Sequence, residues 1–195
     1  MRIAVDVMGG DHGCGVIIDG AKLALAENRE SLLMWAHYTD RHRGFLIGFD
    51  DADGILQVAS PHRDFGPVSY RHHRPSRPLM KEVTNQELFY TKNSEWAYER
   101  EWRIVDSLIS AEGEATDQSR DCWPFRFRTQ AVKEVILGHR ATVIAPNITT
   151  VLSEPRYGHV SLLLATPDQK RFHLNFTELP RSAWGQTILE DADVE

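Results

Sequence analysis

The sequence predicts an α+β protein: a mixed, mostly antiparallel sheet with a few short helices, preceded by an N-terminal βα unit. Short runs of apolar and β-branched residues, separated by turns, recur along most of the chain. Windows with helical periodicity are few and short, and the last two apolar runs resemble a closing hairpin. At 195 residues the chain is long enough for one domain plus an appendage, and it can bury a core without disulfides or metals.

The first 28 residues form a unit of their own. Ile3–Val7 is a β-type run, and the following segment has four glycines between Gly9 and Gly15. Val16–Ala26 then has apolar residues at helical spacing, although Gly20 weakens the pattern. Strand, glycine turn and helix together open many doubly wound α/β folds.

The glycine turn is the first candidate site. Backbone amides at Gly9, Gly10 and Asp11 can face a phosphate. Neither the GxGxxG nor the GxxxxGK[ST] pattern is present, so these three residues are only candidate phosphate-binding positions.

The later elements follow in chain order. Helices are predicted over 32–38, 83–92 with Thr84 as a cap, and 146–152. Strands are predicted over 44–50, 55–59, 68–70, 101–108, 132–138, 159–165 and 171–178. The first two strands are expected to pair as a hairpin, and the last is expected to turn Phe172, Leu174 and Phe176 inward.

Charge and composition limit the function classes. A net charge of −6 argues against a dedicated nucleic-acid binder. The basic stretch 61–77 favours a phosphate-bearing or acidic partner at Arg63, Arg71, Arg74 and Arg77, although a solvated loop is the alternative. Apolar runs are too short to span a membrane and no signal peptide opens the chain, so we expect a cytoplasmic protein.

The candidate catalytic residues are His37, Tyr38, Glu99 and Glu101. On an extended strand Glu99 and Glu101 face the same side, and paired carboxylates can share acid–base work. If a site exists, His37 or Tyr38 is expected within about 8 Å of one of these carboxylates. The alternative is structural: Glu101 pairs with Arg103 and His37 packs in the core.

No cofactor is indicated, and no cluster of cysteine and histidine has metal-ligand spacing. The ExE spacing of Glu99 and Glu101 resembles the motif of arginine-modifying ADP-ribosyltransferases, in which one glutamate orients the nicotinamide ribose. The Ser-Thr-Ser-like strand of those enzymes is not evident here.

Two family resemblances divide the chain. Residues 1–28, "MRIAVDVMGGDHGCGVIIDGAKLALAEN", resemble the start of the bacterial PlsX-type phosphate acyltransferases, which transfer an acyl group from acyl carrier protein to inorganic phosphate in phospholipid synthesis. Nothing later continues that match. We therefore expect its strand to lie at an edge of the sheet or outside it.

The second resemblance spans residues 31–179. The segments "LMWAHYTDRHRGF" (33–45), "VSY" (68–70), Lys92, "WAYEREWRIV" (96–105) and "VILG" (135–138) resemble the bacterial domain-of-unknown-function family 2971. Residues 180–195 form an acidic tail. The resemblance implies an uncharacterised bacterial α+β protein, and the first hypothesis is a nucleotide-handling or defence-linked effector. The alternatives are a phosphate acyltransferase, as an inactive fragment, and a non-catalytic interaction module.

Overall fold

Short alternating apolar runs make strands the main elements of the computed structural model, which describes residues 2–6, 20–50, 63–74, 84–107, 128–142 and 144–184. The strands are β1 (Arg2–Asp6), β2 (Gly20–Ala26), β3 (Phe45–Asp50), β4 (Asp64–Pro67), β5 (Ser69–Arg71), β6 (Thr91–Asn93), β7 (Glu101–Ser107), β8 (Val132–Gly138), β9 (Ser161–Pro167) and β10 (Leu174–Glu178). The α-helices are α1 (Leu32–Tyr38), α2 (Asn85–Phe89) and α3 (Ala145–Leu152). Four short 3₁₀ helices are η2 (Ser94–Glu99), η4 (Thr129–Ala131), η5 (Pro155–Tyr157) and η6 (Arg181–Ala183).

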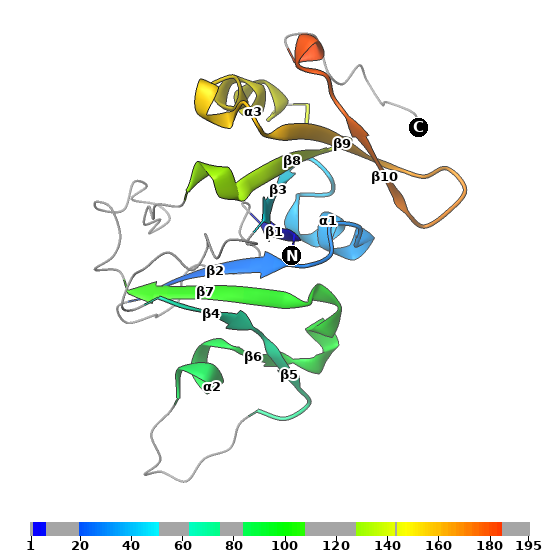
Figure 1. Ribbon diagram of the computed structural model, residues 1–195. Coiled ribbons are helices and arrows are strands. Elements are labelled where there is room, and N and C mark those ends of the chain that lie inside the picture. The colour runs from blue at the N-terminus through cyan, green and yellow to red at the C-terminus, as the bar shows by residue number, and fades with distance from the viewer. Residues whose placement is uncertain are drawn as a thin grey trace.

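Eight of these strands form one sheet in the order β10-β9-β8-β3-β1-β2-β7-β4 (Figure 1). Neighbours in it run antiparallel except β8 and β9, which are parallel. The separate pair β5 and β6 is also parallel. The predicted α+β class with a mostly antiparallel sheet is confirmed.

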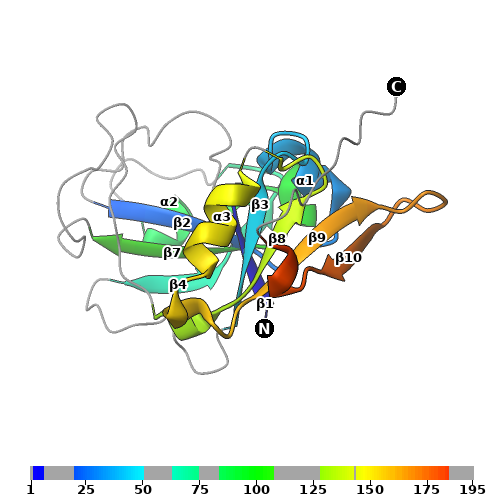
Figure 2. The same ribbon diagram turned by 90° about the horizontal axis from the view of Figure 1, so that it is seen from above.

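The core lies on both faces of the sheet at β8. Val135 and Leu137 belong to one buried cluster, which includes residues of α3. Ile136 points to the opposite face and joins a second cluster around Trp35 of α1. Because successive side chains of a strand alternate between faces, a continuous apolar run such as β8 requires cover on both, and α3 and α1 provide it (Figures 1 and 2).

The N-terminal segment differs from the prediction in two ways. Gly20–Ala26 is strand β2, so the helix expected over Val16–Ala26 is wrong there. β1 lies between β3 and β2 in the sheet, not at an edge or outside it. Periodicity alone does not decide whether a short segment rich in alanine and leucine forms a helix or a strand. All seven residues of β2 pair with β7, which satisfies backbone groups that a seven-residue helix would leave open at its ends.

A left-handed turn connects α1 to β3. Asp40, Arg41 and His42 all have positive φ, at 46°, 55° and 66°. The amide of Gly44 donates to the Thr39 carbonyl at 2.8 Å and closes the turn. Gly138 is required on the facing strand, because a Cβ there would lie 2.2 Å from the carbonyl oxygen of His42.

The remaining predicted elements have mixed outcomes. Thr84 caps α2 in a capping box with Glu87, but the helix ends at Phe89 and β6 follows. The closing hairpin is confirmed as β9 and β10. Leu174 is buried as expected, whereas Phe172 is fully exposed, because it lies in the loop before β10.

Two further expectations concern a hairpin and a membrane. Residues 55–59, expected to pair with 44–50, lie outside the described residues, and β3 pairs with β1 and β8. No helix in the described part of the chain is long and apolar enough to cross a membrane.

Candidate functional site

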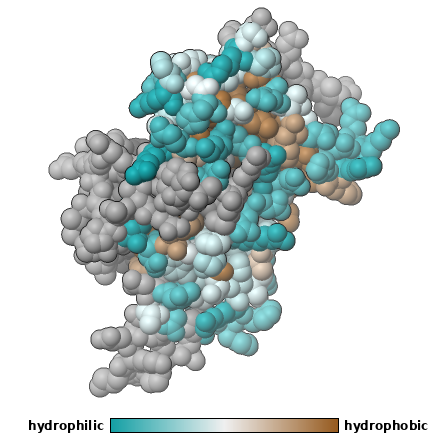
Figure 3. All heavy atoms as spheres, viewed as in Figure 1, coloured by the Kyte–Doolittle hydropathy of each residue, from teal (hydrophilic) through white to brown (hydrophobic). Residues whose placement is uncertain are grey.

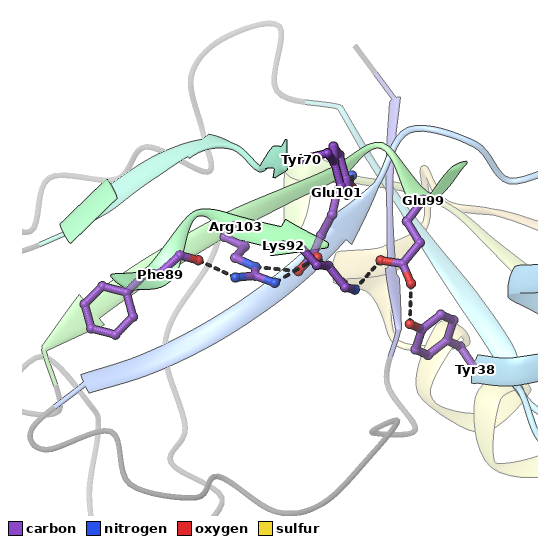
Figure 4. A network of polar contacts seen from close by, with 7 residues as sticks. All are labelled: Tyr38, Tyr70, Phe89, Lys92, Glu99, Glu101 and Arg103. Carbon is purple, nitrogen blue, oxygen red and sulfur yellow. Dashed lines mark hydrogen bonds and ion pairs between the residues drawn. The ribbon is translucent and has the colours of Figure 1, made fainter. Parts of the chain in front are cut away.

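Three of the four candidate catalytic residues, Tyr38, Glu99 and Glu101, meet where the end of α1 approaches the start of β7 (Figure 4). Ser31 caps α1 by accepting a hydrogen bond from the Met34 amide at 3.3 Å, and the seven-residue helix ends at Tyr38. Asn93 caps η2 in the same way, through the Glu95 amide at 3.3 Å, and η2 ends at Glu99. Two short capped helices therefore place Tyr38 and Glu99 side by side.

Glu99 is the centre of the cluster. Its side chain is only 3% exposed. The Tyr38 hydroxyl donates to Glu99 Oε1 at 2.5 Å, and Lys92 Nζ donates to Oε2. Each carboxylate oxygen thus has a donor, and the desolvation of the charge is compensated by a cation and a phenol.

Glu101 is held by Arg103. The guanidinium donates from Nε to Oε1 at 2.6 Å and from Nη2 to Oε2 at 2.9 Å. Its Nη1 also donates to the carbonyl of Phe89, at the end of α2. Bidentate pairs of this kind are the strong ion pairs of proteins. The structural alternative for Glu101, pairing with Arg103, is therefore confirmed.

Lys92 links the two carboxylates, because its Nζ also donates to Glu101 Oε2 at 3.2 Å. The expectation that Glu99 and Glu101 face the same side of one extended strand is wrong, because only Glu101 lies in a strand. Glu99 ends a 3₁₀ helix, and Arg100 between them adopts a left-handed conformation with φ 48°. Their common contact with Lys92, supplied by β6, brings the carboxylates together.

Tyr70 supports the cluster from β5: its hydroxyl accepts a hydrogen bond from the Glu101 amide at 2.8 Å. This bond fixes the first residue of β7 against the parallel pair of β5 and β6. We name the set Tyr38, Tyr70, Lys92, Glu99, Glu101 and Arg103 the carboxylate cluster.

The phenols of the cluster stay protonated at neutral pH. Burial raises the pKa of Tyr38 far above its usual range, and the hydrogen bond to Glu99 and the charge of Glu99 raise it further. Burial also raises the pKa of Tyr70. Tyr38 is therefore a fixed hydrogen-bond donor to Glu99.

The solvent side of the cluster is aromatic and basic. The Lys92 side chain is 23% exposed, and Nζ lies 4.9 Å from the centre of the Trp96 ring. The Trp96 and Tyr98 rings have centroids 6.1 Å apart, and both residues are half-buried. We name this surface, made of Lys92, Trp96 and Tyr98, the aromatic platform.

A basic segment lies beside the platform. The Ser94 hydroxyl, at the start of η2, and His72 Nδ1 are 2.7 Å apart. β5 and β6 pair in parallel with Arg71 opposite Asn93. Arg71 and Arg74 are exposed and make no ion pair with the described residues.

The other predicted site residues are not part of the cluster. The His37 side chain is exposed and makes no hydrogen bond with any residue the structure describes, so neither the catalytic nor the core role predicted for it has a contact to support it. Arg63 is paired with Asp106 at 2.7 Å, with 12% of its side chain exposed, and does not offer a free charge to a partner.

Gly9, Gly10, Asp11 and Arg77 lie outside the described residues. Across the described ranges, no three His, Cys, Asp or Glu side chains are grouped to hold a metal ion.

Lys92 and Tyr70 are the members of the carboxylate cluster to which sequence reasoning gave no role. Both fall in segments of the family resemblance, which was the available signal. Their contact with the carboxylates depends on the pairing of β5 with β6 and on the turn at Arg100. Neither feature has a sequence pattern strong enough to predict it.

A pair of histidines in ring contact, His42 and His139, lies at the left-handed turn. The His42 ring stacks on the Trp35 ring with centroids 5.8 Å apart. The His42 ring also contacts the His139 ring, and the centroids of these two rings are 4.7 Å apart. Nδ1 of each histidine is buried and has no hydrogen-bond partner among the residues that the structure describes. Burial and the neighbouring His139 and Arg140 lower the pKa of His42, and burial and Arg140 lower that of His139.

Fold and site together define an α+β protein with two buried carboxylates whose shared partner, Lys92, is partly exposed to solvent. The family described as "Protein of unknown function (DUF2971)" matches residues 34–104. The matched segment contains the whole carboxylate cluster and the aromatic platform. No curated protein and no solved structure matched the chain. The match does not reach residues 1–28, whose resemblance to phosphate acyltransferases stays a prediction.

Proposed function

We propose that the chain handles a nucleotide, which it binds across the aromatic platform and the basic segment beside it. The observation that carries the proposal is the position of Lys92: its ammonium lies between two buried carboxylates and the Trp96 ring, yet remains partly exposed. Buried ion pairs contribute little net stability compared with an apolar core of the same volume. A cluster of two carboxylates and two cations that opens to solvent is therefore a candidate for function.

The platform suits a nucleobase. Bases stack on tryptophan and tyrosine rings, and each such contact contributes about 1–3 kcal/mol. Trp96 and Tyr98 are close enough to form one continuous surface. The exposed Arg71 and Arg74 then serve the phosphates, because Lys92 is already neutralised by Glu99 and Glu101.

In this proposal Glu99 and Glu101 are positioning residues. Both are buried, so a ligand meets Lys92 and the half-buried Tyr38 before it meets either carboxylate. Glu99 fixes the hydroxyl of Tyr38 and the ammonium of Lys92 in space. Lys92 has a third N–H that can donate to the ribose of a nucleotide, and the Tyr38 oxygen, whose proton goes to Glu99, can accept a hydrogen bond from a ribose hydroxyl.

Calorimetric titration of the full chain with adenosine, AMP, ATP, GTP and NAD tests the proposal. We expect W96A to weaken binding of the best ligand about tenfold, the equivalent of about 1.4 kcal/mol. The double variant R71A/R74A should weaken ATP more than adenosine. R156A, which removes an exposed arginine away from the site, serves as the control. Binding by none of the five, or binding unaffected by W96A, contradicts the proposal.

The two alternative functions make different predictions. A phosphate acyltransferase requires production of acyl phosphate from acyl carrier protein and inorganic phosphate, and its support is confined to residues 1–28. An interaction module using the basic stretch requires salt-sensitive binding that is lost in R71A/R74A without any nucleotide affinity. The carboxylate cluster is needed by neither, so the nucleotide titration separates all three.

A further inference from the structure

The β9–β10 hairpin lies at the opposite end of the sheet from the carboxylate cluster. β10 is the last strand in the sheet order, whereas β7 is next to the other edge. In two views the hairpin extends beyond the body of the molecule (Figures 1 and 2). It belongs to neither the proposed nucleotide site nor the segment matched by the family.

The outer edge of β10 has free backbone groups at alternate residues. The Asp168 amide donates to the His173 carbonyl at 2.9 Å, and the Leu179 amide donates to the Leu162 carbonyl at 2.8 Å. In an antiparallel pair every second residue turns its N–H and C=O to the partner strand. Register therefore points the backbone groups of Leu174, Phe176 and Glu178 away from β9, and because Leu174 is fully buried, the accessible ones belong to Phe176 and Glu178. In the described part of the chain, no strand pairs with them.

The loop at the tip holds an exposed aromatic side chain in a defined position. Phe172 is fully exposed, with a relative accessibility of 103%. Asp168 Oδ1 accepts hydrogen bonds from the amides of Lys170 at 2.8 Å and Arg171 at 2.9 Å. Asp168 Oδ2 accepts one from Asn175 Nδ2 at 3.2 Å. Phe172 is thus presented by an ordered loop, which lowers the entropic cost of using it as an anchor.

The tip is also basic. Lys170, Arg171 and His173 surround Phe172, and all three are exposed. The only carboxylate of the loop, Asp168, is occupied by the loop's own hydrogen bonds. In a chain with net charge −6, this local excess of cations favours an acidic partner. Figure 3 shows hydrophobic surface over β9 and β10 next to the hydrophilic tip.

We propose that this hairpin docks an extended, acidic segment of a partner protein, which adds a strand to the outer edge of β10 and packs an apolar side chain against Phe172. Strand addition uses the open backbone groups of Phe176 and Glu178 for affinity. Phe172 supplies an apolar anchor that becomes buried on binding, and Lys170 and Arg171 select acidic side chains. An anionic membrane surface would use Phe172 and the cations but leave the open strand edge without a role.

The test is fluorescence anisotropy with the full chain and two labelled eight-residue peptides, one alternating valine with glutamate and one alternating valine with lysine. We expect the acidic peptide to bind at least about tenfold more tightly than the basic one. F172S should weaken the acidic peptide about tenfold, since a central aromatic anchor contributes more than about 1 kcal/mol. L88S, at an exposed leucine of α2, should change nothing.

Backbone pairing is tested separately by hydrogen exchange and by a peptide with N-methyl groups on alternate residues. The acidic peptide should protect the amides of Phe176 and Glu178, and the methylated peptide should lose binding. Equal binding of the two parent peptides, an unchanged affinity in F172S, or no added protection overturns the proposal. Binding to phosphatidylserine–phosphatidylcholine vesicles with no peptide binding overturns it in favour of a membrane.

Discussion

The hydroxyl of Tyr38 lies 2.5 Å from Oε1 of Glu99, although the two residues are 61 positions apart in the sequence. This contact joins α1, whose Trp35 packs under β8, to the turn that starts β7. It confirms the prediction that His37 or Tyr38 lies close to one of the two carboxylates. It selects Tyr38 and leaves His37 on the surface.

The Tyr38–Glu99 contact predicts a difference between neighbouring substitutions. Y38F leaves a buried carboxylate oxygen without its donor, and we expect the free energy of unfolding to fall by about 1–3 kcal/mol. H37A alters an exposed side chain and should change stability by less than about 0.5 kcal/mol. Urea denaturation of both variants measures this. A Y38F protein as stable as H37A would show that the hydroxyl contributes nothing.

The Glu101–Arg103 pair predicts a larger loss. E101Q leaves the buried Arg103 guanidinium without a countercharge, and removing one partner of a buried pair costs about 3–5 kcal/mol. E95Q changes an exposed glutamate of η2 and is the matched control. Thermal unfolding of E101Q, E95Q and the double variant E101Q/R103M separates the pair from its environment. A milder loss in the double variant is expected, because no unpaired charge remains.

The His42–His139 contact predicts loss of stability in acid. The pKa of each is lowered in the folded protein, so the unfolded chain takes up protons first as the pH falls. The stability that the two neutral histidines contribute to the free energy of unfolding is fully present above about pH 6.5, and it is lost as the pH falls through their folded-state pKa values. Denaturation midpoints between pH 8 and pH 5 should fall, and less steeply in H139Q. Identical slopes for the two proteins contradict this origin.

The position of β1 and β2 predicts that residues 1–28 are essential to the fold. These strands connect the β10-β9-β8-β3 half of the sheet to the β7-β4 half. Deleting 1–28 exposes the ladder groups of both β3 and β7, and we expect loss of cooperative unfolding by circular dichroism. If the strand lay at an edge of the sheet or outside it, as the sequence predicted, the deletion would cost less than about 2 kcal/mol, typical of a single substitution. A deletion variant with an undiminished transition supports that smaller value.

Local signals in the sequence determined much of the secondary structure. Ser31 and Thr84 have cap geometry at the starts of α1 and α2. The apolar run at β8 and the alternation at β10 were sufficient to predict strands. These features depend on neighbours within a few residues, and capping, turn propensity and side-chain periodicity act over that range.

Tertiary structure decided what local patterns leave open. Gly20–Ala26 became β2 because β7 offered a complete ladder, and Phe172 was left in solvent because β10 begins two residues later. The carboxylates meet through Lys92, placed by a parallel strand pair, and through the left-handed Arg100. The sequence named Tyr38, Glu99 and Glu101 by residue type and spacing. Their partners and burial depend on contacts between distant segments, which chain packing alone determines.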